Sequence, residues 1–260
     1  MEDKSLVADK FTARARGWSE NEYADPSSFM ERRAALVQRW GTPLCSGDRI
    51  LEIGCGDGSL SCLLARQGFE VTGVDISRGM IEEAKGRADR ERVAVRFEVA
   101  DIDSFEVVEP YDGLISFMSA FFTYLENPSR FIEATLPFVR KKMIVDWNFR
   151  SPCTFVEAAQ QLRRAGLERV EWRPWFIRHT PSLGVSASRL RGWIEGKPNL
   201  ALLLLRLKRW HYTVYLKGEK DQALEQCDAS SDGKEFHGHS LPSSILQRSL
   251  IRPRQGTQKK

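Results

Sequence analysis

Residues 50–58 read Ile-Leu-Glu-Ile-Gly-Cys-Gly-Asp-Gly, and this stretch decides the fold. A mostly apolar run suited to a strand passes directly into three alternating glycines, and the amphipathic segment Ser59 to Arg66 follows. Glycine adopts the backbone angles of a tight turn and lets a ligand approach the backbone amides at the start of a helix. The stretch therefore predicts a strand, a ligand-binding turn and a helix in succession.

The same alternation of short apolar runs and amphipathic segments continues along the chain. It is typical of strand–helix–strand units and predicts an α/β fold with a doubly wound, seven-stranded, mostly parallel sheet. Two β-rich runs follow a predicted helix C-cap at Gly166 and supply the last two strands. The predicted strands are 49–53, 70–74, 93–99, 112–117, 142–147, 169–178 and 210–217.

Asp75 ends the second predicted strand, 17 residues after Gly58, where a carboxylate can accept both hydroxyls of a ribose. A dinucleotide fingerprint requires G-x-G-x-x-G/A, but its third small position falls here on Ser59. The spacing therefore favours a nucleoside-containing cofactor other than a dinucleotide.

The spacing E-x-G-x-G-x-G, which begins at Glu52, resembles motif I of the class I S-adenosylmethionine-dependent methyltransferases. The resemblance covers roughly residues 45 to 178. Its other segments are Asp75-Ile76-Ser77 with Met80, Val99-Ala100-Asp101-Ile102, and Pro110 to Phe117. The family's Pro-Gly-Gly turn before strand five is replaced by Pro137-Phe138-Val139-Arg140.

The resemblance implies a methyltransferase of Rossmann-like fold that uses S-adenosylmethionine, and the scattered histidines predict no metal site. It implies that the backbone of residues 54–58 passes the methionine moiety, that Asp75 holds the ribose, and that Asp101 and Ile102 flank the adenine. The implied cofactor-binding residues are Glu52, Gly54, Cys55, Gly56, Gly58, Asp75, Ile76, Met80, Asp101, Ile102 and Phe117.

The chain is predicted to divide into three parts. Residues 1–44 form an N-terminal helical lid, in which Ser19 to Glu22 match a capping box. Residues 45–217 form the methyltransferase domain, with a substrate-side insertion at 181–209. Residues 218–260 lose apolar periodicity and are predicted to be a disordered tail.

The acceptor is expected to be a small, fairly hydrophobic molecule, because aromatic residues cluster after strand four and can line a pocket. Core packing explains about half of these aromatics equally well. The residues proposed to face the acceptor are Tyr23, Phe121, Tyr124 and Asn148, with Phe117 and Phe122 in the same cluster.

No catalytic residue is assigned, because the sulfonium already activates the methyl group. His179 and His211 are weak candidates for a general base, and Asp146 stands at the carboxyl edge of strand five. Cys153 is interpreted as the residue before a helix cap at Thr154, in preference to a nucleophile. The segment 181–217 holds seven basic residues against one acidic residue, so an acidic or amphiphilic substrate can dock there.

Composition narrows the remaining alternatives. Thirty-nine basic against 35 acidic residues give a net charge of +4, which excludes a polybasic protein and makes nucleic acid a disfavoured partner. An RNA methyltransferase, an NAD-dependent oxidoreductase and a non-catalytic scaffold stay open as alternatives.

The longest apolar run, 200–205, is too short to cross a bilayer. The five cysteines are odd in number, scattered and without C-x-x-C spacing, which argues against a disulfide framework and a structural zinc site and fits a cytoplasmic location.

Overall fold

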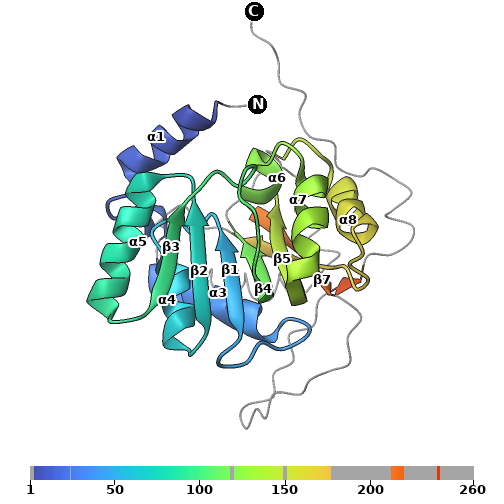
Figure 1. The fold of residues 1–260 in the computed structure, drawn as a ribbon, viewed down its shortest axis with the longest axis horizontal. Helices are drawn as coiled ribbons and strands as arrows, with labels where there is room; N and C mark the ends of the chain where they lie inside the picture. The colour runs from blue at the N-terminus through green and yellow to red at the C-terminus, as the bar shows by residue number, and fades with distance from the viewer. Residues whose placement is uncertain are drawn as a thin grey trace, which may run out of the picture.

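The computed structural model describes residues 3–23, 25–117, 120–148, 151–176, 212–219 and 239–240. A central sheet has the strand order β3-β2-β1-β4-β5-β7-β6-β8 (Figure 1). The strands from β3 to β5 are parallel neighbours, whereas β7 runs antiparallel to β5 and β6. The strands are β1 Arg49–Ile53, β2 Glu70–Asp75, β3 Val95–Val99, β4 Tyr111–Ser116, β5 Val139–Trp147, β6 Glu171–Phe176, β7 Tyr212–Glu219 and β8 His239–Ser240.

Helices cover both faces of this sheet, so the predicted seven-stranded, mostly parallel α/β fold is confirmed, with the two-residue β8 added at one edge. Leu51 and Ile53 of β1 join one core cluster with α6, α7 and α8, whereas Ile50 joins another with α3 and α4. The helices are α1 Lys4–Arg14, α2 Trp18–Glu22, α3 Pro26–Arg39, α4 Ser59–Arg66, α5 Arg78–Glu91, α6 Ala120–Tyr124, α7 Pro128–Thr135 and α8 Phe155–Arg164, and a 3-10 turn covers Leu136–Phe138.

Local sequence signals explain several element ends. β1 and α4 begin and end where the sequence predicts. The capping box at Thr154 is confirmed, since its side chain accepts from the Glu157 amide and the Glu157 carboxylate accepts from the Thr154 amide. The final strand, however, continues to Glu219, beyond the boundary predicted at residue 217, because Gly218 and Glu219 pair with β5.

Buried lysine and glutamate side chains of β5 and β7 join these strands to the end of α3. Lys142 of β5 is fully buried and donates from Nζ to the Trp40 carbonyl (2.9 Å), just past the end of α3. Lys217 and Glu219 of β7 form a buried ion pair (2.9 Å), and the Thr42 amide donates to the Glu219 carboxylate. This polar cluster fixes the end of α3 against the antiparallel part of the sheet.

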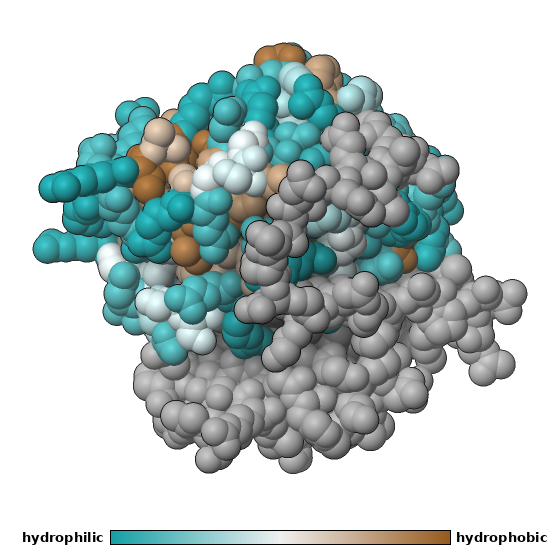
Figure 2. Space-filling model, turned by 90° about the horizontal axis from the view of Figure 1, so that it is seen from below, coloured by the Kyte–Doolittle hydropathy of each residue, from teal (hydrophilic) through white to brown (hydrophobic). Residues whose placement is uncertain are grey.

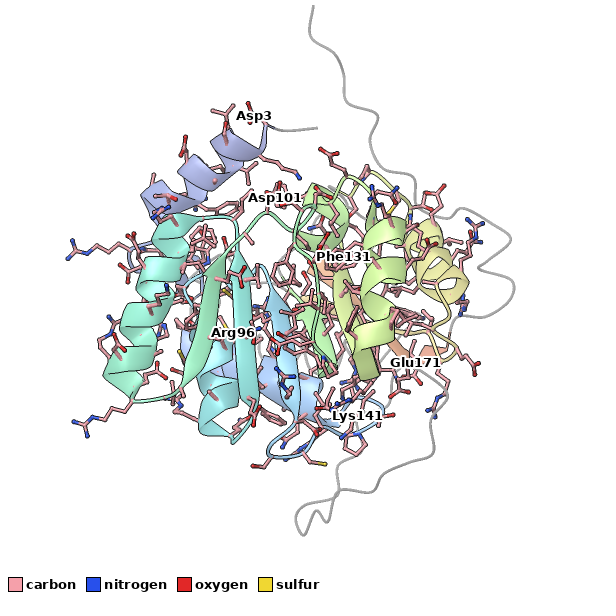
Figure 3. The ribbon with its side chains drawn as sticks, viewed as in Figure 1. Asp3, Arg96, Asp101, Phe131, Lys141 and Glu171 are labelled. Atoms are coloured by element: carbon pink, nitrogen blue, oxygen red, sulfur yellow. The ribbon has the colours of Figure 1, made fainter. Side chains whose placement is uncertain are left out.

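Different residues lie at the two ends of the strands. Figure 3 shows Asp101 directly beneath α1, while Lys141 and Glu171 lie at the opposite end of the strands. Seen from below, the described residues present a mainly hydrophilic surface with scattered apolar patches (Figure 2). Within the part of the chain that the structure describes, no helix has the length and apolar character needed to cross a membrane.

Candidate cofactor and acceptor site

The glycine loop between β1 and α4 has the backbone that its sequence demands. Gly54, Gly56 and Gly58 have φ angles of 71°, 56° and 72°, which are left-handed values that other residues rarely adopt. The amides of Gly54 and Cys55 donate to the Val74 carbonyl of β2 (2.7 and 3.1 Å). A Cβ atom added to Gly56 would meet no atom within 4 Å, so open space lies beside the loop where a ligand can contact its backbone.

Asp75, at the end of β2, lies against this loop. Its Oδ2 accepts from the Gly56 amide (3.0 Å) and its Oδ1 from the Ser77 amide (2.9 Å). Burial raises the pKa of Asp75, and the two backbone amides oppose that shift. The structure therefore brings together the glycine loop and the carboxylate that the sequence assigns to the ribose. Met80 is buried nearby in α5, and Ile76 is half-buried.

Asp101, which follows β3, is in contact with the N-terminal helix. Lys4 of α1 donates from Nζ to both carboxylate oxygens of Asp101 (2.9 and 2.8 Å) and also contacts Asp103. Further along α1, the Thr12 hydroxyl lies 2.9 Å from the Ser77 hydroxyl. Helix α1 thus lies at the carboxyl ends of β2 and β3, beside the residues that the sequence predicts to bind the cofactor (Figure 1).

Asp57, inside the glycine loop, is a site residue that the sequence interpretation missed. It accepts from the Ser19 amide (3.3 Å) and hydroxyl (2.9 Å), from the Ser59 hydroxyl (2.7 Å) and from Arg87 of α5 (2.9 Å). The capping box predicted at Ser19 is therefore wrong, because α2 is preceded by Gly17 and the Ser19 side chain binds Asp57 instead. The buried Asp57 carboxylate ties the lid to the loop.

Glu52 lies near the end of β1 and is 4% exposed. Its carboxylate accepts from the Ser61 hydroxyl of α4. Burial raises the pKa of Glu52 to about 7, although Ser61 and the positive charge of Arg33 favour the ionised form. Burial also raises the pKa of the Cys55 thiol well above its ordinary value, so this cysteine of the loop is no thiolate nucleophile at neutral pH.

The aromatic residues proposed to face the acceptor differ in burial. Phe121 and Phe122 are fully buried in the cluster with α7 and α8, which agrees with the core-packing alternative. Phe117 is buried against Tyr215 of β7, with ring centroids 4.7 Å apart. Tyr124 is half-buried with its ring edge towards Phe11 (6.4 Å). A pattern of aromatics after a strand does not separate a pocket wall from a core.

The other candidates lie in different places. Asp146 is fully buried on β5, and the backbone amide of Asn148 donates to the Ser151 hydroxyl (3.3 Å) at the end of that strand. Cys153 has a pKa raised to about 11 by burial, which agrees with its interpretation as a structural residue. The general-base candidates His179 and His211 and the insertion 181–209 lie outside the described residues.

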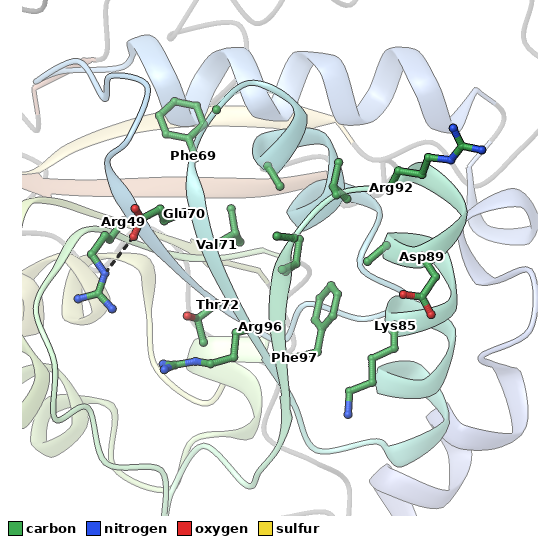
Figure 4. A pocket seen from close by; sticks show the side chains of 16 residues that line it. Arg49, Phe69, Glu70, Val71, Thr72, Lys85, Asp89, Arg92, Arg96 and Phe97 are labelled. Atoms are coloured by element: carbon green, nitrogen blue, oxygen red, sulfur yellow. Dashed lines mark ion pairs between the residues drawn. The ribbon is translucent and has the colours of Figure 1, made fainter.

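A groove of about 810 Å³ lies at the other end of the sheet. It is lined by Arg49, Glu70, Val95 and Arg96, among others, which stand at or near the amino ends of β1, β2 and β3 (Figure 4). Because the glycine loop and Asp75 lie at the carboxyl ends, this groove is separate from the residues predicted to bind the cofactor. Among the described residues, no group of three or more His, Cys, Asp or Glu side chains could hold a metal ion.

Comparison with known proteins gives matches over the same part of the chain. Residues 50–141 match a family model described as a methyltransferase domain. A malonyl-[acyl-carrier protein] O-methyltransferase from Anoxybacillus flavithermus is 38% identical over 134 residues, 51% of this chain and 48% of that protein. A ubiquinone biosynthesis O-methyltransferase from Coxiella burnetii is 40% identical over 57 residues, 22% of this chain and 24% of that protein. The chain spans about half the length of the first curated relatives that it matches.

A solved structure supports the fold at lower identity. Magnesium protoporphyrin IX methyltransferase from Synechocystis PCC 6803, with bound SAH, has a TM-score of 0.57 and 17% identity, and the match covers 85% of this chain and 100% of that one. The matched family model contains the glycine loop, Asp75 and Asp101, the residues that the structure gathers at one edge of the sheet. Residues 50–141 are therefore similar to a methyltransferase domain, and the described part of the chain has the fold of that solved methyltransferase.

Proposed function

We propose that the protein transfers the methyl group of S-adenosylmethionine to an oxygen atom of a small acceptor. Relatives named as O-methyltransferases support the choice of oxygen, although each aligns with only part of this chain. A partly hydrophobic acceptor is proposed from the aromatic residues of the sequence interpretation, of which Tyr124 is half-buried rather than buried.

The observation that carries the proposal is the joint position of the glycine loop, Asp75 and the lid. Asp75 is fixed to the Gly56 amide, and the lid is fixed to the loop through Asp57. These contacts form a site at the carboxyl ends of β1 and β2, where ligands bind in open α/β sheets. The open space beside Gly56 and the nearby carboxylate suit the nucleoside and amino-acid parts of the cofactor.

The cofactor supplies a methyl carbon already made electrophilic by the adjacent sulfonium. With the cofactor bound, a lone pair of the acceptor oxygen would form the new C–O bond while the C–S bond breaks and its electron pair goes to sulfur, and any proton on that oxygen would leave to solvent. The chain therefore has to orient the acceptor in line with that bond and exclude water. The raised thiol pKa values of Cys55 and Cys153 agree with transfer that passes through no covalent enzyme adduct.

Ligand binding followed by turnover tests the proposal. S-adenosylhomocysteine should raise the melting temperature and give a measurable heat in calorimetric titration, whereas NAD should do neither. Incubation with methyl-labelled S-adenosylmethionine and a panel of alcohols, phenols and acids should then yield labelled ethers or esters. Stabilisation by NAD alone would point to an oxidoreductase. Tight cofactor binding without labelled product from any acceptor, extracts included, would point to a non-catalytic scaffold.

A further inference from the structure

Arg33 is a buried cation on the apolar face of α3. It is 3% exposed and lies among Phe29, Met30, Ala34 and Val37, which are also buried. Its Nη2 atom is buried and has no hydrogen-bond partner. Among the residues that the structure describes, none forms a salt bridge with Arg33 within 4 Å. A buried guanidinium group without such partners is costly, so its presence requires an explanation.

The surrounding rings hold the guanidinium group in place, while the buried Asp146 and Glu52 carboxylates act on it through their charge without forming a salt bridge within 4 Å. Its central carbon lies 4.3 Å from the ring centroid of Phe29 and 5.3 Å from that of Phe117. Arg33 Nε donates to the Tyr215 hydroxyl (3.2 Å). Burial raises the pKa of Tyr215, so this phenol stays neutral and supplies no full negative charge. The rings of Phe29, Phe117 and Tyr23 (5.9 Å) and the Tyr215 hydroxyl thus orient the group, while Nη2 keeps its donor capacity.

The place of Arg33 in the fold indicates which ligand it faces. Phe117 follows β4 and Tyr215 belongs to β7, which lie beyond β1 in the sheet order. Asp75 and Asp101 follow β2 and β3, on the other side of β1. The contacts of Arg33 are therefore with the half of the sheet opposite the ribose and adenine residues. That half is the one left for the methyl acceptor.

We propose that Arg33 binds a carboxylate of the methyl acceptor, so that the acceptor of this enzyme is an organic acid. The inference rests on the methyltransferase function proposed above and specifies its substrate class. A guanidinium group pairs with a carboxylate through parallel N–H donors, and the flanking rings would exclude water from the pair. The amino-acid carboxylate of the cofactor could pair with Arg33 in the same way. The experiment below distinguishes binding of this carboxylate from binding of the acceptor.

The test uses the full chain, its Arg33→Met and Arg33→Lys variants, and Arg39→Met as the matched control. Arg39 lies on the same helix and is exposed. The acceptor probes are two acid–amide pairs, benzoate with benzamide and hexanoate with hexanamide, titrated into protein saturated with S-adenosylhomocysteine. The cofactor probes are S-adenosylhomocysteine and methylthioadenosine, which lacks the amino-acid carboxylate.

The acids should bind the wild type and Arg39→Met at least about tenfold more tightly than their amides, and Arg33→Met should lose this preference. Arg33→Lys, which keeps the charge but not the fork, should keep only part of it. The affinity for S-adenosylhomocysteine should not change in any variant.

Three results would overturn the inference. The first is a wild type that binds acids and amides equally, which decides the question even if Arg33→Met does not fold. The second is an acid preference that Arg33→Met retains. The third is a loss in Arg33→Met of S-adenosylhomocysteine affinity but not of methylthioadenosine affinity, which would assign Arg33 to the cofactor. Failure of the wild type to bind S-adenosylhomocysteine would instead refute the proposed function itself.

Discussion

Glu52 gives a quantitative prediction, because its carboxylate is buried at the end of β1 and titrates near neutrality. The change is Glu52→Gln, which keeps the size of the side chain and an oxygen that can accept from the Ser61 hydroxyl. The pKa of Glu52 in the folded protein is about 7, against an ordinary value of 4.5. The folded state therefore holds the proton over a pH range in which the unfolded state has lost it.

The sign and size of the effect follow from this difference. Between pH 4.5 and about 7 the folded state binds more protons than the unfolded state, so Glu52 makes stability fall as the pH rises. The cost is absent below pH 4.5 and is complete above about pH 7. Moving the pKa over that range corresponds to about 3 kcal/mol of the free energy of unfolding.

Urea denaturation at a series of pH values measures this cost. The stability of Glu52→Gln relative to the wild type should grow by up to about 3 kcal/mol between pH 4.5 and pH 8. Glu98→Gln is the matched control, because Glu98 is an exposed carboxylate on β3. Parallel profiles for Glu52→Gln and the wild type would refute the reasoning, since Glu52 would then titrate normally.

Three further changes test other parts of the structure. Asp75→Asn should weaken S-adenosylhomocysteine binding by at least about tenfold in calorimetric titration, because charge-assisted hydrogen bonds to the ribose are lost, and an unchanged affinity would show that the ribose is held elsewhere. Cys153→Ser should keep its turnover of methyl-labelled cofactor, since a thiol of pKa about 11 is no nucleophile at neutral pH, and a hundredfold loss in a folded variant would restore that role. Burial lowers the pKa of Lys142 to about 7 from 10.5, so between these pH values the unfolded state binds more protons than the folded state. The stability of the wild type relative to Lys142→Met should therefore rise by up to about 1.4 kcal/mol per pH unit across that range. A difference in urea midpoint between the two proteins that is the same at pH 7 and pH 9 would contradict this.

The parts of the fold that the sequence predicts well are those set by local pattern. The glycines at 54, 56 and 58 mark the end of β1 and the start of α4, because few other residues adopt their backbone angles. The capping residues at Thr154 act within three positions of one another, so spacing alone is sufficient. The cofactor edge of the sheet follows from these signals and from the order of the strands.

The features that the sequence interpretation missed depend on tertiary contacts. Ser19 satisfies a helix-cap pattern, but its hydroxyl binds Asp57, which lies 38 residues further along the chain. Phe121 and Phe122 are as compatible with a pocket as with a core until α7 and α8 are in place. Arg33 had a detectable signal, since it is a lone charge on the apolar stripe of α3. Its lack of a hydrogen-bond partner at Nη2 could be seen only in three dimensions.

The contact between Thr42 and Glu219 has a consequence for how the protein is made. The two residues are 177 positions apart, yet the amide of one and the carboxylate of the other meet at the buried end of α3. During synthesis, the segment after α3 cannot complete its packing until β7 has left the ribosome. Until then, α1 to α3 and β1 to β5 are expected to form a partly assembled state with exposed apolar surface. Chaperones bind species of this kind. Folding of this domain is expected to be completed only after β7 has been synthesised.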